Sequence, residues 1–246
     1  MFTEIYHVIL YEPIFNLLVF FYNLVGDIGL AIILLTIVIK ILLSPFFIQS
    51  VKSQRAMQAI QPKLDELKEK YKDKKEELGP AIMQLYKKEK VSPFSSCLPL
   101  LIQFPFLIAV FQVFRIGLID GGALNNIYPF ITNPGTLNVM SLGILDMGKS
   151  SILIAVLAGI AQFWQSKTMM AKRQPTVKAN QNNMASTMTK QMMYMMPIIT
   201  VFIGSSLPAG LTFYWFLTTL LGAVQQVYVF KKMDQNFSFD KSSEDK

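Results

Sequence analysis

Apolar residues gather into five stretches that are long enough, or nearly long enough, to cross a bilayer. They run over Gly29–Phe47, Ser96–Phe114, Ser151–Phe163, Met192–Gly204 and Ala209–Phe230. A helix needs about 20 apolar residues to cross about 30 Å of hydrocarbon. The third and fourth stretches are shorter than that, so we expect the bilayer to thin locally around them.

A sixth apolar stretch, Ile5–Val25, precedes these five and is interrupted by Glu12 and a proline. Its polar positions Glu12, Asn16, Asn23 and Asp27 follow i, i+4, i+11 and i+15, which is one face of a helix. This pattern favours an amphipathic helix lying in the membrane interface. The alternative is a poor sixth span.

The basic residues of the loops predict the orientation. Eleven Lys and Arg lie between positions 50 and 95, and five lie in 167–190 without an acid. The first 27 residues carry none, and 117–150 carries one. Basic loops stay in the cytoplasm, so we expect the N-terminus outside and the C-terminus inside. The acidic, non-basic start does not resemble a signal peptide, and we expect Met1 to lie close to the mature start.

The first basic loop is patterned rather than random. Apolar residues recur at steps of three and four over 54–71 and again over 76–90, and Asp73-Lys74-Lys75 separates the two runs. This predicts a charged helical hairpin that projects into the cytoplasm. The alternative is a solvated charge run, since basic and acidic residues are mixed throughout it. The later basic loop is rich in Asn, Gln, Thr and Ser and is expected to be flexible.

The predicted fold is therefore all-α: a polytopic membrane protein with five transmembrane helices, an N-terminal interfacial helix and a cytoplasmic helical hairpin. Composition agrees, with 52% hydrophobic and only 16% charged residues. The predicted boundaries are an external interfacial helix at 1–27, spans at 28–49, 96–116, 148–167, 191–206 and 209–230, the cytoplasmic hairpin at 50–95, an external loop at 117–147, a cytoplasmic loop at 168–190 and a cytoplasmic tail at 231–246.

Lys40 stands near the middle of the first span. It lies about 15 Å from either end of a helical span, and a charge at that depth costs about 2.5–3.5 kcal/mol. Thr36 and Ser44 flank it at i−4 and i+4 on the same helical face. A polar stripe predicts a hydrated pocket around Lys40; the alternative is a displaced helix whose lysine snorkels to the headgroups.

Other spans offer polar partners for such a pocket, although each alone is common in helix packing. Gln103 and Gln112 lie in the second span and Gln162 in the third. In the fifth span Thr212, Trp215, Thr219 and Gln226 share one face, and Tyr214, Thr218 and Gln225 share its neighbour. Six methionines crowd 184–196, at the entry of the fourth span; they suit a pliable surface for varied apolar partners or ordinary gap-filling in helix packing.

The five spans contain no Asp or Glu, which ion-coupled transporters and cation paths normally require. The single Cys97 and single His7 give neither a disulfide nor a metal cluster. Motifs of hydrolases, metalloproteases and nucleotide-binding loops are missing from the sequence. We therefore expect no enzymatic activity and no cofactor.

Several segments, in order along nearly the whole chain, resemble the YidC-type membrane protein insertases. They are Thr36–Pro45 (TIVIKILLSP), Gln61–Lys63, Lys87–Pro93, Cys97–Pro105 (CLPLLIQFP), Met195–Pro197, Leu207–Trp215 (LPAGLTFYW) and the pair Gln225–Gln226. The resemblance is to a compact five-span form without the large extracytoplasmic domain and extra first span of some members.

The resemblance implies a groove that is open to the cytoplasm and to lipid and that holds one positive residue. That residue is usually arginine in the family, and the matching position here is Lys40, which keeps the charge but loses the bidentate fork. Thr36 and Trp215 match positions that line the substrate path, and the hairpin matches the mobile cytoplasmic loop. The third-span glutamine is either Gln162 or Gln165. The tail is short and mixed in charge, so a ribosome contact there is expected to be weak.

We therefore expect a plasma (inner) membrane insertase that draws client segments into a hydrated groove lined by the residues named above, and releases them sideways into lipid. Expected partners are client membrane proteins, lipids, a ribosome or targeting factor at the cytoplasmic loops and, by resemblance only, the Sec translocon. Two rivals stand beside it. One is a small transporter or channel for an anionic solute that uses Lys40 as its binding charge, and the other is a scaffold with a structural Lys40.

Overall fold

A computed structural model of the chain describes residues 2–92, 98–115, 127–170 and 184–244. Its elements are α1 (Phe2–Tyr6), the π-helical η1 (His7–Tyr11), α2 (Glu12–Val25), α3 (Ile28–Ala59), α4 (Gln61–Lys70), α5 (Lys75–Lys88), α6 (Leu98–Gln112), β1 (Met140–Ser141), β2 (Leu145–Asp146), α7 (Ile152–Met170), α8 (Met184–Gly204) and α9 (Ala209–Glu244). The predicted all-α membrane fold is confirmed, with one two-stranded antiparallel hairpin that the sequence pattern did not predict.

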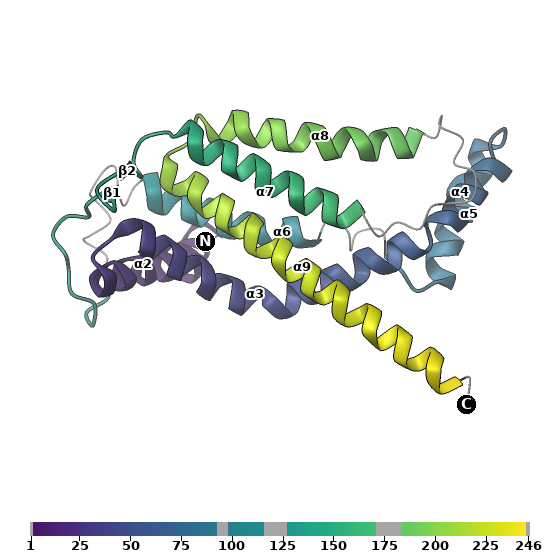
Figure 1. The fold of residues 1–246 in the computed structure, drawn as a ribbon, viewed down its shortest axis with the longest axis horizontal. Helices are drawn as coiled ribbons and strands as arrows, with labels where there is room; N and C mark the ends of the chain where they lie inside the picture. The colour runs from purple at the N-terminus through teal and green to yellow at the C-terminus, as the bar shows by residue number, and fades with distance from the viewer. Residues whose placement is uncertain (1, 93–97, 116–126, 171–183, 245–246) are drawn as a thin grey trace.

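The long helices α3, α7, α8 and α9 follow the long axis of the molecule (Figure 1). Helix α9 packs against α3, α6 and α7, and α8 packs against α7. The β1–β2 hairpin and α2 lie at one end of the molecule, and α4 and α5 lie at the other (Figure 1). We call the end with β1–β2 and α2 the loop end. We call the opposite end, where α4 and α5 form a helical hairpin, the hairpin end.

The N-terminal helix is continuous across the predicted interruption at Glu12 and Pro13. Pro13 is the second residue of α2, and the turn before it widens into η1, which accommodates the N–H that proline lacks inside a continuous helix. Gly26 ends the helix in the left-handed conformation (φ 72°) that glycine adopts without strain. Asp27 then begins α3.

The polar face of this helix binds the chain's own loop. Asn16, which is only 2% exposed, accepts a hydrogen bond from the Tyr128 N–H (2.7 Å). The Asn23 amide donates to the Thr132 carbonyl (2.7 Å), and the Tyr22 hydroxyl accepts from the Asn138 N–H (3.0 Å). Two of the four polar positions that predicted an interfacial helix, Asn16 and Asn23, thus have partners in loop 127–138. The placement of the helix in the interface stays a prediction.

Several helices extend past the predicted span boundaries because polar residues do not stop a helix, and the span boundaries themselves stay predictions. Helix α3 runs ten residues past the predicted span end at 49, through Pro45, and breaks from α4 at Ile60. Gln54, expected to start the hairpin, therefore lies inside α3. Helices α4 and α5 pack against each other, and the chain turns between them at 71–74.

The last two helices also extend beyond the membrane spans predicted within them. Helix α8 begins at Met184, inside the predicted loop 168–190, and α9 continues to Glu244 through the predicted tail 231–246. Helix α7 runs from Ile152 to Met170 rather than over 148–167. The predicted start of the second span at 96, positions 117–126 of the external loop and 171–183 of the cytoplasmic loop lie outside the described residues.

Within the described ranges, four helical segments are long and apolar enough to cross a membrane: Glu4–Val25, Ile28–Ala59, Ile152–Met169 and Ala209–Met233. Two shorter apolar segments, Gln103–Arg115 and Met193–Gly204, correspond to the predicted second and fourth spans. The N-terminal helix thus also reaches the length of a span, and the number of five spans stays a prediction. Large apolar side chains on α7 and α8 are exposed, Phe202 to 76%, as on a lipid-facing surface.

Candidate functional site

Buried apolar side chains form two clusters, one at each end of the bundle. The loop-end cluster joins α2, α3, α6 and α9 and includes Phe15, Ile32, Ile39 and Tyr214. The hairpin-end cluster joins α3 to α9 through Val51, Val229 and Phe230. Buried positions on α3 stop at Ile39 and resume at Ser50, so Lys40 begins the stretch between the two clusters.

Lys40 extends along α3 toward α9. Its ammonium lies 5.2 Å from the ring centroid of Phe47, two turns further along the same helix. A Cβ atom added to Gly222 of α9 would lie 3.3 Å from Lys40 Nζ, 2.9 Å from Gln165 Nε2 and 3.9 Å from Phe47 Cε2. Side chains from α3 and α7 thus converge on one point of α9. The third-span glutamine that reaches this point is Gln165.

Ser44 and Gln225 connect α3 to α9 one turn further toward the hairpin end. The Gln225 Nε2 group donates to Ser44 Oγ at 2.8 Å, and both side chains are partly buried. Because Gln225 follows Gly222 by three residues, this hydrogen bond lies on the same side of α9 as the Lys40 contact. Together, Lys40, Ser44, Gln165, Gly222 and Gln225 form what we call the α3–α7–α9 polar seam.

Gln103 and Tyr214 meet each other at a different level. Gln103 Nε2 lies 2.9 Å from the Tyr214 hydroxyl, and Tyr214 is 1% exposed within the loop-end cluster. Tyr214 precedes Gly222 by eight residues, about 12 Å along a helix. This pair therefore joins α6 to α9 inside the core, at some distance from the Lys40 ammonium.

The remaining predicted site residues are placed as follows. Thr36 is fully buried, and its hydroxyl donates to the Ile32 carbonyl at 2.6 Å, so it does not join the polar seam. Thr219 is buried, whereas Trp215 and Gln162 are partly exposed. The predicted stripe at i−4 and i+4 around Lys40 therefore divides: Ser44 contacts α9, and Thr36 bonds to its own helix.

The polar seam has a net positive charge. Helices α3, α6, α7 and α8 contain no Asp or Glu, and α9 contains none before Asp234. The Lys40 ammonium lies over the Phe47 ring and against α9 at Gly222, the point to which the Gln165 amide also extends. A cation surrounded by neutral groups at this depth is a site that attracts a negative group.

At the loop end, Asp27 ties the start of α3 to the β-hairpin. Its carboxylate accepts from the Leu30 N–H (2.9 Å), the Ser141 hydroxyl (2.8 Å) and the Leu142 N–H (2.6 Å). Burial raises the pKa of Asp27, but the hydrogen bonds from Leu142, Leu30 and Ser141 outweigh it and hold that pKa below its ordinary value. The sequence pattern placed Asp27 on a polar face and did not reveal these partners.

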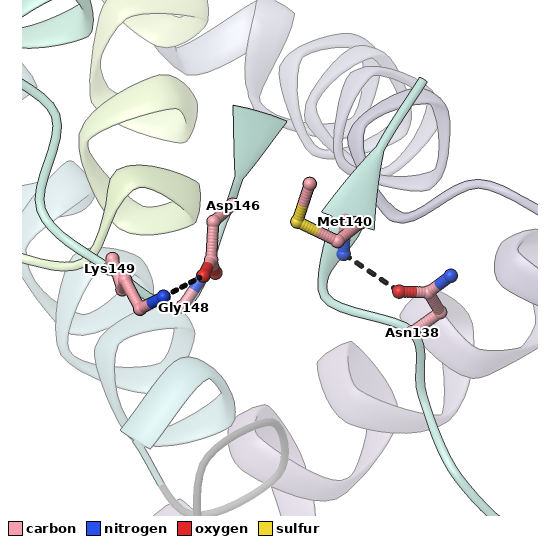
Figure 2. Close-up of polar contacts among 5 residues, drawn as sticks. All are labelled: Asn138, Met140, Asp146, Gly148 and Lys149. Carbon is pink, nitrogen blue, oxygen red and sulfur yellow. Dashed lines mark hydrogen bonds and ion pairs between the residues drawn. The ribbon is translucent and has the colours of Figure 1, made fainter. Parts of the chain in front are cut away.

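The hairpin continues into a second set of contacts, with α9. Figure 2 shows Asp146 beside Lys149 and Gly148, and Asn138 accepting a hydrogen bond from the Met140 N–H. The Asp146 carboxylate lies 3.1 Å from Lys149 Nζ and accepts from the Gly148 N–H at 3.0 Å. The Lys149 ammonium holds the pKa of Asp146 below its ordinary value. The Lys149 carbonyl in turn accepts from the Ala209 N–H at 2.7 Å. Loop, α3 and α9 are thus joined at the loop end.

A family model described as "60Kd inner membrane protein" matches residues 20–236. The chain belongs to this family. The membrane protein insertase YidC of Chlamydia trachomatis serovar D is 37% identical over 224 residues, which are 90% of this chain and 28% of that protein. The YidC of Fusobacterium nucleatum subsp. nucleatum is 33% identical over 208 residues, 85% of this chain and 88% of that protein.

A crystal structure of an active YidC insertase, with its first transmembrane domain resolved, matches the fold with a TM-score of 0.59 and 25% identity. The match covers 87% of this chain and 45% of that one. Several of the YidC relatives are longer, since this chain spans 28% of the chlamydial protein and 39% of the Rickettsia rickettsii protein. Family membership confirms the resemblance found in the sequence. It also confirms the prediction of a multi-pass inner-membrane protein.

One member of the polar seam, Gly222, and the neighbouring aromatic residue Phe47 were missed from the sequence. Gly222 and Phe47 look like ordinary apolar-span residues, and only a lone glycine inside a helical pattern hinted at a close approach. Gln225 was named as part of a polar face, but its partner Ser44 lies 181 residues away in the chain. Pairing of that kind depends on how helices rotate against one another.

Proposed function

We propose that this chain is a membrane protein insertase that captures polar or acidic client segments at the α3–α7–α9 polar seam. The observation that carries the proposal is the Lys40 ammonium, which lies over the Phe47 ring and against α9 at Gly222, in a helix that contains no Asp or Glu. Membership of a family whose relatives are named insertases supports it.

The mechanism follows from charge and hydrophobic transfer. A client's acidic N-terminal segment is drawn to Lys40 within a hydrated groove, and the short apolar stretch Met192–Gly204 of the fourth span thins the bilayer that it must cross. The client's apolar helix then moves sideways into lipid, where it is held by the hydrophobic effect. The exposed apolar faces of α7 and α8 support a lateral exit. No covalent bond changes, so the proposal includes no enzymatic turnover.

In the proposed topology the loop end is extracytoplasmic and the hairpin end is cytoplasmic. The eleven basic residues of 50–95 support this orientation, as does the position of α4 and α5 opposite the β-hairpin (Figure 1). The α4–α5 hairpin would receive the client and, with the other basic loops, meet a ribosome or targeting factor. A Sec translocon is a further proposed partner.

The test is complementation in cells depleted of their own insertase. Wild type, Lys40→Arg and Lys40→Met are supplied, and insertion of two single-span clients is followed by protease protection. The clients differ only in their N-tail, which is acidic in one and neutral in the other. Because Met keeps the length of Lys without its charge, we expect Lys40→Met to impair the acidic client most, and Lys40→Arg to retain most of its insertion.

Two results would contradict the proposal at different points. If the wild-type chain inserts neither client although it reaches the membrane, the insertase function is wrong. If wild type inserts both clients and Lys40→Met inserts the acidic one equally well, insertion occurs but charge capture by Lys40 is wrong. Membrane vesicles prepared from the cells that express the wild-type chain, and loaded with a small organic anion, show whether the chain conducts anions instead.

A further inference from the structure

The Lys40 ammonium is placed between two residues, Phe47 and Gly222, which we call the Lys40 seat. Its ammonium lies over the Phe47 ring at 5.2 Å from the centroid, within the range of a cation–π contact. Phe47 packs against the hairpin-end cluster, which includes Val51 and Phe230, so its ring is held by neighbours rather than free in lipid. The adjacent Phe46 is 54% exposed.

Gly222 forms the other side of this seat. A Cβ at 222 would come to 3.3 Å from Lys40 Nζ and 2.9 Å from Gln165 Nε2, closer than these atoms ordinarily tolerate. Glycine inside a helix weakens it relative to alanine, so this position gains nothing in helix stability from the choice. What the missing side chain provides is room for two polar groups against the α9 backbone.

We infer that Phe47 and Gly222 are positioning residues that hold the Lys40 ammonium beside Gln165, where it meets client carboxylates. This inference rests on the proposed function. Gly222 opens the surface of α9 to the lysine, and the Phe47 ring attracts the ammonium along α3 toward the hairpin end. A client arriving from that end therefore meets the charge before it reaches the loop-end cluster.

A lysine needs such a seat more than an arginine does. Its ammonium is a point charge on a flexible four-carbon stem, whereas a guanidinium is a rigid planar fork. Immobilising a flexible side chain during binding costs entropy. Residues that already hold the lysine side chain in place before the client binds remove part of that cost. Phe47 and Gly222 thus pre-organise a side chain that is flexible on its own.

The first experiment replaces Phe47 in the insertion assay with paired acidic-tail and neutral-tail clients. Phe47→Leu keeps an apolar side chain and removes the ring; a cation–π contact of ordinary strength corresponds to a loss of about two- to fivefold for the acidic client. Phe47→Tyr retains an aromatic face and should insert the acidic client as well as wild type does. Phe46→Leu is the matched control, being the same change on the neighbouring exposed residue. We expect it to leave both clients unaffected.

The second experiment uses Gly222→Ala. Alanine favours the helix, and the atoms that its methyl group meets are the ends of flexible side chains, so α9 is expected to remain in place. The ammonium and the Gln165 amide must then move. We expect insertion of the acidic client to fall while insertion of the neutral client and the amount of folded protein in the membrane stay at the wild-type level.

A double-mutant cycle separates this inference from the function on which it rests. In a Lys40→Met background, Phe47→Leu and Gly222→Ala should cause no further loss for the acidic client, because the group that they position is gone. If Lys40→Met is defective but Phe47→Leu and Gly222→Ala match wild type, the seat is wrong and charge capture stands. If Phe47→Leu and Gly222→Ala reduce insertion of the acidic and the neutral client equally, or still reduce insertion in the Lys40→Met background, the two residues have a structural role and the inference is overturned. If Lys40→Met is itself normal, charge capture has failed first.

Discussion

Asp27→Ala tests whether the loop end of the bundle is held together by one carboxylate. Asp27 is the N-cap of α3 and accepts hydrogen bonds from the Leu30 N–H, the Ser141 hydroxyl and the Leu142 N–H. The last two partners belong to the β-hairpin loop, more than 110 positions away in the chain. Alanine removes all three acceptor contacts while leaving the backbone of the helix unchanged.

The magnitude follows from these contacts. Loss of an N-cap costs about 0.5–2 kcal/mol, and each of the two loop hydrogen bonds contributes about 0.5–1.5 kcal/mol. The carboxylate is only partly buried, so we use the range for ordinary rather than fully buried charged hydrogen bonds. The expected decrease in the free energy of unfolding is therefore about 1.5–5 kcal/mol.

The assay is reversible unfolding of the purified protein in mixed micelles, followed by circular dichroism. Asp73→Ala, which removes an exposed carboxylate in the turn between α4 and α5, is the matched control and should change the free energy by less than about 0.5 kcal/mol. In a cycle with Ser141→Ala, we expect a coupling energy of about 0.5–1.5 kcal/mol. A change for Asp27→Ala no larger than that of the control, or zero coupling to Ser141, would refute the reasoning.

Three other predictions concern the same end of the molecule. Asn16→Ala leaves the Tyr128 N–H without its partner and should lower the free energy of unfolding by about 1–3 kcal/mol, measured in the same way. Gly210→Ala drives a methyl group to 2.4 Å from the Phe114 ring and should cost about 1–3 kcal/mol, with partial recovery in a Gly210→Ala, Phe114→Leu double variant. Because the folded-state pKa of Asp27 is lowered, its stabilisation is present above the ordinary value of 3.8 and is lost as the pH falls through the lowered value; Asp27→Asn should therefore flatten the acid-unfolding curve below about pH 4.

The hydrophobic pattern predicts where the helices lie better than it predicts where they end. The apolar stretches located the helices, but α3, α8 and α9 each extend beyond the apolar residues that predicted them. Hydrophobicity reports where a helix meets lipid, whereas a helix ends only where its backbone hydrogen bonds end. Gly26, in the left-handed conformation, ends α2 for that reason, and the charged residues after Phe230 do not end α9.

The amino-acid sequence by itself determined that the chain is an all-α membrane protein of the YidC family and that Lys40 lies deep in its first long helix. These properties depend on residue type and spacing along one segment, which the sequence records directly. It also indicated that no carboxylate of the predicted spans pairs with Lys40, because those spans contain no Asp or Glu.

Only the tertiary structure decided which of those groups meet. Gln162 and Gln165 lie one turn apart on α7, and choosing between them requires the rotation and depth of α7 against α9. The same holds for Ser44 with Gln225, for the room left by Gly222, and for Asp27 with the β-hairpin loop. Each is a contact between segments far apart in the chain. Such contacts are set by the packing of whole helices, which no local pattern encodes.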